Sequence, residues 1–552
     1  MKLARAFRQI VRPLVQTANQ YHGVRQSVRR FQSHGTRQST SRALQGLSRL
    51  WPSAFIAAGV TGLGLISWPY EPWTSGHSEE QQIKYADRET MLKGVQTISD
   101  ALGPDSVTMD EDDIDLHSNS EISTSQCATR PVAVVTPKNT AEVSIIARIC
   151  SEYKIPMIPF GGGSSVEGHF TAPYSGLSID FSEMNQIVAF HEEDMDVVVQ
   201  PGVNWMDLNN EIKDSGLFLP MDPSPTALIG GMVATNCSGT NAVRYGTMKD
   251  WVINLTVVLA DGSVIKTRHR PRKTSAGYNL TGLFTGSEGT LGMITEITLK
   301  LAPVPAKESV AVATFPSVKD AVASASKIIR QGILVAAVEL MDEVQMEVLN
   351  RNGGAGGRMW PEKPTLLLKF SGSTDSIAAD IRRVEDIIAQ QGGSAFEFAR
   401  TKTEMHNLWA ARKEAIWAML AQKPEGTQLW STDVAVPLSR LPEIIDLSKK
   451  ESQGLGLFSS VLGHVGDGNF HQAVMYDPNI ASQTQAVQDC VKNMVRRAVE
   501  MEGTVSGEHG IGLGKKECLM EELGFETVAV MRTLKRSLDP HCLMNPGKVF
   551  EP

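Results

Sequence analysis

A glycine-rich loop that follows a strand–helix–strand pattern most constrains how this chain can fold. Residues 132–135 have the pattern of a strand, 140–153 that of a helix with Thr140 at its N-cap, and 155–160 that of a short extended segment containing two prolines. The next residues read Pro159-Phe-Gly-Gly-Gly-Ser-Ser-Val-Glu-Gly-His169. Because ligands commonly bind where strands end in such sheets, this order predicts an α/β or α+β domain with a ligand site at the loop.

Consecutive glycines suit this loop to phosphate binding. Without Cβ atoms, the backbone N–H groups of residues 161–163 can turn inward and form a concavity for phosphate oxygens, and Ser164 and Ser165 add hydroxyl donors. The spacing matches neither a P-loop nor a G-x-G-x-x-G fingerprint. Further small-residue clusters follow later strands, at 201–202, 230–239, 244–246 and 286–292. Such close backbone packing predicts a large flat ligand with a pyrophosphate, for which FAD is suitable.

The remaining sequence predicts two domains. Strand patterns at 187–190, 196–200, 251–259, 263–265 and 293–299 complete the first, with Asp261-Gly262 as a hairpin turn. Beyond Pro305 the character changes. Strands at 310–314 and 365–369 alternate with helices at 317–331, 374–391 and 402–421. This region is therefore predicted to be a second α+β domain.

Histidines in two glycine-punctuated motifs predict a metal site. His464 and His471 stand at the two ends of a turn, and Glu508 lies in Gly507-Glu-His-Gly510. Two imidazoles and a carboxylate leave coordination positions open, which is typical of a catalytic zinc or manganese site. His509, next to Glu508, is then free to act as a base. A lone histidine is usually structural, but this grouping favours function.

Three polar residues near these motifs have more than one interpretation. Asp467 and Asn469 fit turn formers or residues that support the ligands better than ligands. Arg412, on the predicted helix 402–421, could present its guanidinium to a substrate carboxylate. Taken alone, Arg412 fits a solvated surface residue better.

The N-terminus differs sharply from the body. Residues 1–70 hold ten of the 53 Lys and Arg and none of the 61 Asp and Glu, so the rest of the chain is strongly acidic. An Arg-rich, Ser-rich, acid-free start predicts a mitochondrial leader over residues 1–50. The apolar stretch 51–69 predicts a single transmembrane anchor, with a cleaved sorting signal or the leader's end as alternatives. The acidic body argues against nucleic-acid binding, and six widely spaced cysteines predict free thiols.

Ordered motifs from about residue 127 to the end resemble one family. They are P-F-G-G-G-S-S-V-E-G at 159–168, G-G-M-V-A-T-N at 230–236, R-Y-G at 244–246, L-F-T-G-S-E-G-T-L-G at 283–292, L-W-x-x-R at 408–412, T-D-V-A-V-P at 432–437, G-H-V-G-D-G-N-F-H at 463–471, G-E-H-G at 507–510 and N-P-G-K at 545–548. Together they resemble the FAD-linked oxidases of the vanillyl-alcohol oxidase/PCMH fold, in the D-2-hydroxyacid dehydrogenase branch.

This resemblance implies an α+β architecture with defined domains. A linker and N-terminal helical region at 70–125 would precede a PCMH-type FAD-binding domain of two α+β subdomains at 126–304. A substrate or cap domain carrying the metal site would span 305–505. The C-terminal segment 506–552 would return to the flavin and complete the active site.

The resemblance also implies FAD held non-covalently, with no link through His169. The glycine loop would hold the pyrophosphate, and later segments would line the flavin. The implied cofactor-binding residues are Pro159, Phe160, Gly161, Gly162, Gly163, Ser164, Ser165, Gly168, Pro201, Gly202, Pro223, Gly230, Gly231, Ala234, Thr235, Asn236, Ser238, Gly239, Arg244, Tyr245, Gly246, Glu288, Gly289, Gly292, Ile294 and Asn545.

The implied chemistry is the oxidation of D-lactate to pyruvate. Arg412 would bind the carboxylate, a divalent ion on His464, His471 and Glu508 would contact the hydroxyl, and His509 would take its proton while hydride passes to the flavin. Ala473 stands where the D-2-hydroxyglutarate enzymes of the branch carry a polar residue, which favours a short monocarboxylate.

The expected acceptor is cytochrome c, because an anchored chain with its cationic leader in the matrix would place the acidic body in the intermembrane space. The matrix is the alternative location. Other functions stay open: D-2-hydroxyglutarate or glycolate oxidation on the same fold, a metallohydrolase that activates water on the same ligands, or an electron-transfer or scaffold protein with a structural flavin.

Overall fold

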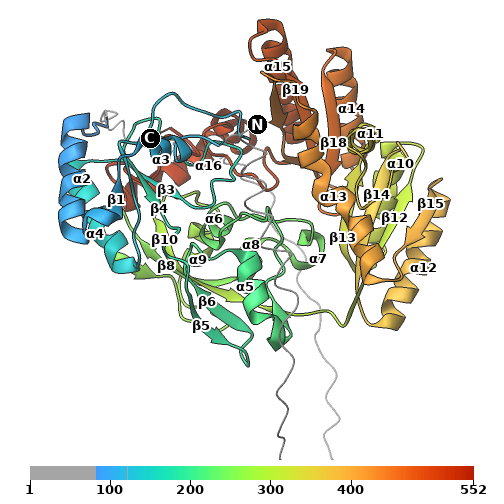
Figure 1. Cartoon of the computed structure of the whole chain (residues 1–552), viewed down its shortest axis with the longest axis horizontal. Helices are drawn as coiled ribbons and strands as arrows, with labels where there is room; N and C mark the ends of the chain where they lie inside the picture. The colour runs from blue at the N-terminus through green and yellow to red at the C-terminus, as the bar shows by residue number, and fades with distance from the viewer. Residues whose placement is uncertain (1–82, 121, 552) are drawn as a thin grey trace, which may run out of the picture. The chain divides into compact units, whose positions relative to one another are not determined.

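The structure is a computed structural model that describes residues 83–120 and 122–551 (Figure 1). All of them belong to one unit of the chain, Glu79–Pro552. The predicted leader at 1–50 and the predicted anchor at 51–69 lie outside the described residues. Among the described helices, none combines the length and the apolar character that crossing a membrane requires.

A four-stranded sheet forms the first layer of the predicted FAD-binding domain. Its order is β1-β2-β4-β3, with parallel pairing of β2, β4 and β3 and antiparallel pairing of β1. Its strands are β1 (Val107–Thr108), β2 (Ala133–Val135), β3 (Met157–Phe160) and β4 (Leu177–Asp180). The strand–helix–strand prediction is confirmed, since α4 (Thr140–Tyr153) connects β2 to β3. The predicted cap is wrong by one residue: Asn139 accepts the Glu142 amide at 3.1 Å and is the N-cap.

Three short elements precede this sheet or flank its first strand: α2 (Arg88–Leu102), η2 (Pro104–Ser106) and α3 (Glu111–Leu116). Met91, Val95 and Ile98 of α2 are buried in the same apolar core as α4 and the sheet. The helical segment predicted before the FAD domain therefore packs onto that domain.

A five-stranded antiparallel sheet forms the second layer. Its order is β5-β6-β10-β8-β9, and the Asp261-Gly262 turn joins β8 to β9 as predicted, with Gly262 at φ +83°. Its strands are β5 (Ile187–His191), β6 (Asp196–Val199), β8 (Val252–Val258), β9 (Val264–Lys266) and β10 (Met293–Lys300). Around it lie α5 (Trp205–Ile212), η3 (Lys213–Ser215), β7 (Leu217–Phe218), α6 (Ile229–Ala234), α7 (Ala242–Tyr245), α8 (Met248–Trp251), α9 (Leu280–Phe284) and β11 (Ala302–Pro303).

The cap domain is one large antiparallel sheet with helices on both faces (Figure 1). The strand order is β15-β12-β14-β13-β18-β19-β16, and β17 also pairs with β19. Its strands are β12 (Lys307–Thr314), β13 (Val335–Met341), β14 (Thr365–Gly372), β15 (Ser394–Phe398), β16 (Gln428–Ser431), β17 (Val434–Ala435), β18 (Phe458–Gly463) and β19 (Asn469–Tyr476). The predicted second α+β domain is confirmed.

Side chains alternate along β13 between two apolar cores. Val338 and Leu340 pack with the helices α10 (Val318–Arg330), α12 (Thr374–Gln390), α14 (Leu441–Gly454) and α15 (Ala481–Glu500). Ala337 and Met341 pack on the other face with α11 (Glu343–Arg351) and α13 (Lys402–Gln422). Glu339 lies between these two on the α13 face, so a charged residue interrupts the apolar core there.

The C-terminal segment returns to the first sheet, as predicted. After α16 (Lys516–Leu538), which kinks at Gly524, Met544 bridges to Met157 of β3. The Met157 amide donates to Leu543 O at 2.7 Å, and the Asn545 amide donates to Met157 O at 2.8 Å.

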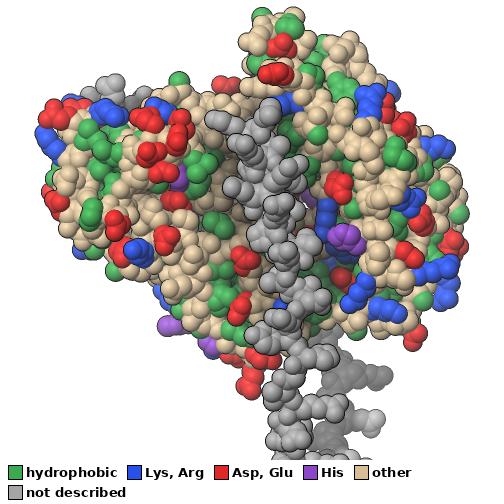
Figure 2. Space-filling view, viewed as in Figure 1, with side chains coloured by type: hydrophobic (Ala, Val, Ile, Leu, Met, Phe, Trp, Pro, Cys, Tyr) green, Lys and Arg blue, Asp and Glu red, His purple; other side chains and the backbone are tan. Residues whose placement is uncertain are grey.

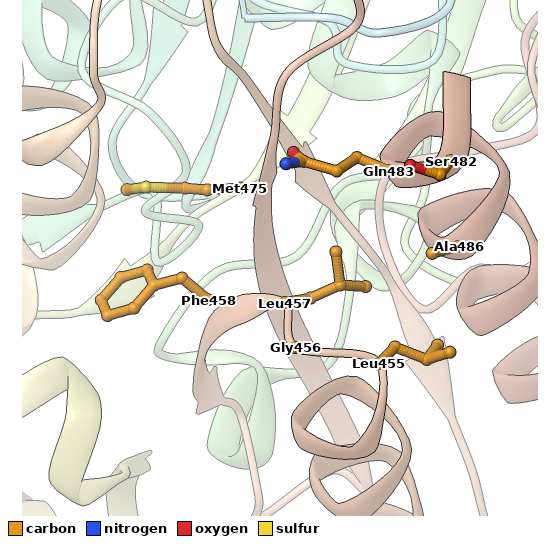
Figure 3. A pocket seen from close by; sticks show the side chains of 8 residues that line it. All are labelled: Leu455, Gly456, Leu457, Phe458, Met475, Ser482, Gln483 and Ala486. Carbon is orange, nitrogen blue, oxygen red and sulfur yellow. The ribbon is translucent and has the colours of Figure 1, made fainter. Parts of the chain in front are cut away.

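A cavity of about 400 Å³ opens at the turn between α14 and β18. Figure 3 shows Phe458 and Met475 on one side of it and Ser482, Gln483 and Ala486 of α15 on the other. Its lining has no titratable side chain and includes none of the predicted site residues.

Candidate active site

The glycine loop after β3 presents a row of free amides. The backbone N–H groups of residues 161–165 make no hydrogen bond to any other described residue. Gly162 is required here because a Cβ would lie 2.5 Å from the carbonyl oxygen of Thr226. At Gly161 and Gly231 the position of a Cβ is open, with a nearest neighbour at 4.0 Å or beyond. Free amides around an open backbone surface fit the pyrophosphate of a dinucleotide.

Backbone hydrogen bonds bring the predicted cofactor segments together. The Gly230 amide donates to Pro201 O at 2.8 Å, and the Glu288 amide donates to Ala234 O at 2.8 Å. A Cβ on Gly289 would lie 3.0 Å from Pro159, so the 286–292 loop packs against the start of the glycine loop. These contacts gather residues from four stretches of the sequence, at 159–163, 201–202, 230–234 and 286–292, into one surface.

Other members of the predicted cofactor set lie on the same segments. They are Pro159, Phe160, Gly163, Ser164, Ser165, Gly168, Gly202, Pro223, Thr235, Asn236, Gly239, Tyr245, Gly246, Gly292 and Ile294. Ser238, Arg244, Glu288 and Asn545 form side-chain hydrogen bonds to segments that are distant in the sequence.

Ser238 and Arg244 reach from the FAD domain to the cap-side residues. The Ser238 hydroxyl donates to Oε2 of Glu508 at 2.5 Å. The Arg244 guanidinium donates to the carbonyls of Leu334 and Ser371 at 3.4 and 3.3 Å. Arg244 therefore connects its domain to the cap domain, and Ser238 connects it to the C-terminal segment, two roles that the sequence did not indicate.

Glu288 and Asn545 fix the C-terminal segment. The two carboxylate oxygens of Glu288 accept the amides of Ile511 and Gly512 at 2.8 and 2.7 Å, and its Oε2 lies 3.0 Å from Nε2 of His169. The Asn545 amide group donates to the carbonyls of His169 and Glu288 at 3.0 and 2.8 Å. These polar groups are buried and act inside the fold.

The three predicted metal ligands converge. His464 follows β18, His471 lies in β19, and Glu508 comes from the loop after α15. Nε2 of His464 and Nε2 of His471 each lie 3.2 Å from Oε1 of Glu508. The donor atoms of the three residues lie within 4.8 Å of one another. Two imidazoles and a carboxylate at this spacing fit zinc or manganese.

Partners on the far sides of the rings orient both histidines. Nδ1 of His464 lies 2.8 Å from Oε1 of Glu339, and Nδ1 of His471 lies 3.0 Å from the carbonyl oxygen of Thr432. Because both partners accept, each ring in its neutral form carries its proton on Nδ1 and has its Nε2 lone pair available for a cation. A second combination, Asp433 with His471 and His509, also lies close enough for metal binding. The donor role of His471 Nδ1 favours the set that contains Glu508.

Glu508 and His464 each shift the pKa of the other. Burial raises the pKa of the Glu508 carboxyl, but His464 and His471 outweigh it and hold that pKa well below its usual value. Burial lowers the pKa of His464, but Glu339 and Glu508 outweigh it and hold that pKa well above its usual value. An imidazole that ligates a cation must be neutral, so metal binding here releases a proton.

His509 has the properties of a general base. Its ring stacks on that of His471 at 5.0 Å and 13°. Its Nδ1 is sealed from solvent and has no hydrogen-bond partner among the described side chains and backbone. Burial is the largest cause that lowers the pKa of His509, to about 4, although Asp433 opposes this. The imidazole is therefore neutral near pH 7 and can accept a proton.

Asp433 holds the loop that carries Glu508 and His509. Its Oδ2 accepts the amides of Glu508 and His509 at 2.9 and 2.8 Å and the Ser506 hydroxyl at 2.8 Å. Its Oδ1 accepts from the Asn469 side chain at 2.8 Å, which confirms Asn469 as a supporting residue. Burial raises the pKa of Asp433, but His509 and Lys515 outweigh it and hold that pKa far below its usual value.

Arg412 lies on α13 and is not a solvated surface residue. Its side chain is 15% exposed, and its Nε donates to Oε2 of Glu339 at 2.7 Å. The two Nη groups make no hydrogen bond to another described residue. They are therefore free to form a bidentate contact with a carboxylate.

Two important residues received no role from the sequence. Asp433 lies inside the T-D-V-A-V-P motif, so its position was marked but not its function. Glu339 is the single acid in Val335–Met341, a strand buried along its whole length. A charge inside an apolar strand is costly unless it is paired, and that is the signal that could have found Glu339.

Comparison with known proteins supports the predicted fold and the predicted FAD-binding domain. The family model for the FAD binding domain matches residues 131–268, and that for the C-terminal domain of FAD linked oxidases matches residues 304–549. The solved structure of p-cresol methylhydroxylase with substrate bound has a TM-score of 0.70 at 17% identity, over 84% of this chain and 98% of the other. This likeness confirms the predicted fold.

Two curated relatives are much closer in sequence. The mitochondrial D-lactate dehydrogenase [cytochrome] of Kluyveromyces lactis is 44% identical over 85% of this chain and 83% of the relative. Its counterpart in Arabidopsis thaliana, with the same name, is 46% identical over 81% of this chain and 78% of the relative. On this identity and coverage, the chain belongs to the D-lactate dehydrogenase (cytochrome) family of FAD-linked oxidases.

Proposed function

We propose that this chain is an FAD- and divalent-metal-dependent enzyme that oxidises D-lactate to pyruvate and passes the electrons to cytochrome c. The observation that carries this proposal is the grouping of Arg412, the ligand set and the neutral His509 next to the FAD domain. Ser238 of that domain donates to the ligand Glu508, so the cofactor surface and the ligand set are adjacent. The names of the relatives support D-lactate as the substrate.

Each protein group has a defined task in this reaction. The free Nη groups of Arg412 bind the substrate carboxylate and fix its orientation. His464, His471 and Glu508 hold the ion, and His509 takes the proton of the substrate hydroxyl. When bound, the metal ion lowers the pKa of that hydroxyl and the flavin accepts the hydride from C2. Oxidation to the 2-oxo acid removes one hydride and one proton, which this arrangement accounts for.

A small apolar residue supports a short substrate. Ala473 lies two residues after His471 on β19, so the two side chains project from the same face of the strand. It is 2% exposed and packs in the apolar cluster that contains Trp409 and Leu462. A second substrate carboxylate would find no polar partner at Ala473. D-Lactate or glycolate is therefore favoured over D-2-hydroxyglutarate.

The electron acceptor and the location follow from charge and from the relatives' names. The relatives are called mitochondrial and their names carry the word cytochrome. Figure 2 shows acidic side chains gathered near α2 and α3, where Glu111, Asp112 and Asp115 are exposed. An acidic body attracts a small basic carrier such as cytochrome c. We place the enzyme at the mitochondrial inner membrane, anchored by residues 51–69, with its body in the intermembrane space.

A metallohydrolase is the second candidate, because the same ligands and base could activate water. It leaves the row of free amides at 161–165 without a use. An absorption spectrum of the purified full-length protein, recorded without oxygen before and after D-lactate is added, separates the two. We expect a yellow protein that D-lactate bleaches and L-lactate does not. A yellow protein that stays unbleached would reject the substrate, and a colourless folded protein supplied with FAD would reject the flavoenzyme.

Replacing Arg412 with lysine should raise KM for D-lactate by about 10- to 100-fold with a smaller change in kcat, since one charge-assisted hydrogen bond and the planar fork are lost. Steady-state kinetics with a dye acceptor measure both constants. Arg382→Lys is the matched control, because Arg382 is exposed on α12. A KM within twofold of wild type would contradict the assignment.

The pH dependence of kcat/KM should follow His509. Because the pKa of this imidazole is lowered to about 4, the neutral, base-competent form prevails at higher pH. We expect kcat/KM to stay level from pH 8 to about 5.5 and to fall as the pH approaches 4. His509 also makes the free energy of unfolding fall as the pH falls. The reason is that the unfolded state takes up the proton at the ordinary histidine pKa of about 6.5, whereas the folded state takes it up only near its lowered pKa. A fall in kcat/KM centred near pH 6.5 would contradict this prediction.

A further inference from the structure

Glu339 joins two parts of the site that act on different groups. It lies in the middle of β13 and is 1% exposed. Its Oε2 accepts Nε of Arg412 at 2.7 Å, and its Oε1 accepts Nδ1 of His464 at 2.8 Å. One buried carboxylate thus contacts both the substrate-binding cation and a metal ligand.

We propose that Glu339 is a positioning residue that couples metal binding to substrate-carboxylate binding. It fixes the tautomer of His464 and the plane of the Arg412 guanidinium at the same time. The substrate half of this inference rests on the proposed function. The metal half depends only on the ligand set.

The His464 side of this coupling concerns the tautomer. An ionised carboxylate only accepts, so the ring nitrogen that faces Glu339 must carry the proton. In the neutral ring, Nε2 then keeps its lone pair for a cation that Glu508 also binds, and Oε1 of Glu508 lies 3.2 Å from this Nε2. Partners of this kind also raise the basicity of a metal-ligating histidine.

The Arg412 side concerns orientation. With Nε committed to Glu339, the guanidinium plane is set and both Nη groups stay available for another contact. The pair also offsets the cost of burying either charge alone. Substrate-carboxylate geometry therefore depends on the same residue that prepares the metal ligand.

An amide of the same shape cannot replace this carboxylate. The Glu339→Gln variant would have one oxygen and one NH₂ group where the carboxylate has two acceptors. Either the Nε–H of Arg412 or the Nδ1–H of His464 would then face a donor. If the amide NH₂ faces His464, the ring proton moves from Nδ1 to Nε2, where it prevents metal coordination. If the NH₂ faces Arg412, the Nε–H loses its acceptor and the guanidinium plane is no longer fixed.

A manganese titration of the FAD-loaded full-length protein tests the coupling. Free Mn²⁺, measured by electron paramagnetic resonance, gives Kd for wild type and for Glu339→Gln. We expect Kd to rise by about 10- to 100-fold in the variant. We also expect KM for D-lactate, measured at saturating Mn²⁺, to rise by about tenfold.

Glu343→Gln is the matched control. It makes the same chemical change on α11, where the carboxylate is 41% exposed and contacts Lys449 at 2.7 Å. Its Mn²⁺ Kd and its KM should stay within twofold of wild type. In Glu339→Gln, a change in only one constant, or in neither, would overturn the coupling.

A second variant covers the case in which Glu339→Gln does not fold. Arg412→Lys removes the Nε–H donor from the other side, and an unchanged Mn²⁺ Kd in that variant would also overturn the coupling. The proposed function fails separately, when wild-type protein binds Mn²⁺ and FAD but does not oxidise D-lactate. The Mn²⁺ titration still tests the metal half in that event.

Discussion

Replacing His509 with glutamine should lower kcat for D-lactate oxidation by about 10²- to 10⁴-fold, the range that a general base contributes. Glutamine keeps the approximate size of the side chain but cannot accept the hydroxyl proton. The backbone amide that binds Asp433 is unaffected, so the loop should stay in place. Stopped-flow measurement of flavin reduction by D-lactate without oxygen isolates this step.

The spectrum of bound FAD and the Mn²⁺ Kd should match wild type in this variant, which shows that the loss is chemical. His406→Gln is the control, because His406 is exposed on α13. A reduction rate within tenfold of wild type would assign the proton to a different acceptor. If the flavin were only structural and the protein did not turn over D-lactate, the His509→Gln and His406→Gln variants would show the same flavin reduction rate.

Replacing Asp433 with alanine should lower the free energy of unfolding by about 3–5 kcal/mol and abolish Mn²⁺ binding at micromolar metal. The substitution leaves the amides of Glu508 and His509 and the Ser506 hydroxyl without their acceptor. It also leaves Lys515, whose Nζ lies 3.8 Å from Oδ2, with only Glu167 as a nearby acid. Denaturant unfolding and a Mn²⁺ titration measure the two effects.

Asp342→Ala separates stability from site geometry. Asp342 is also fully buried in the cap domain, where it caps α11 and pairs with Lys449 at 2.7 Å. We expect that variant to lose stability of similar size and to keep its Mn²⁺ Kd. If both variants kept their Mn²⁺ Kd, the anchoring role of Asp433 would be wrong.

Local sequence patterns determined much of the fold. Helices α10 and α12 match their predicted ranges within one residue, because an apolar stripe with a polar N-cap specifies a helix over a short window. The glycine loop alone would fit a flexible loop equally well, and the later small-residue clusters at 201–202, 230–239, 244–246 and 286–292 favoured a ligand-binding loop. The sequence singled out His464, His471 and Glu508 because their motifs combine donor chemistry with glycine turns, and the structure brings these three side chains together.

The sequence alone determined the family, the order of most elements, and the predicted metal ligands, base and substrate-binding arginine. The tertiary structure decided which of those groups touch: Glu339 meets His464 across 125 positions, Ser238 meets Glu508 across 270, and Asp433 meets His509 across 76. Such contacts depend on the register of β13, β18 and β19 and on the docking of the cap, and no local periodicity encodes them. A buried carboxylate gains its partners only when distant strands pack, so its role becomes visible only in the folded molecule.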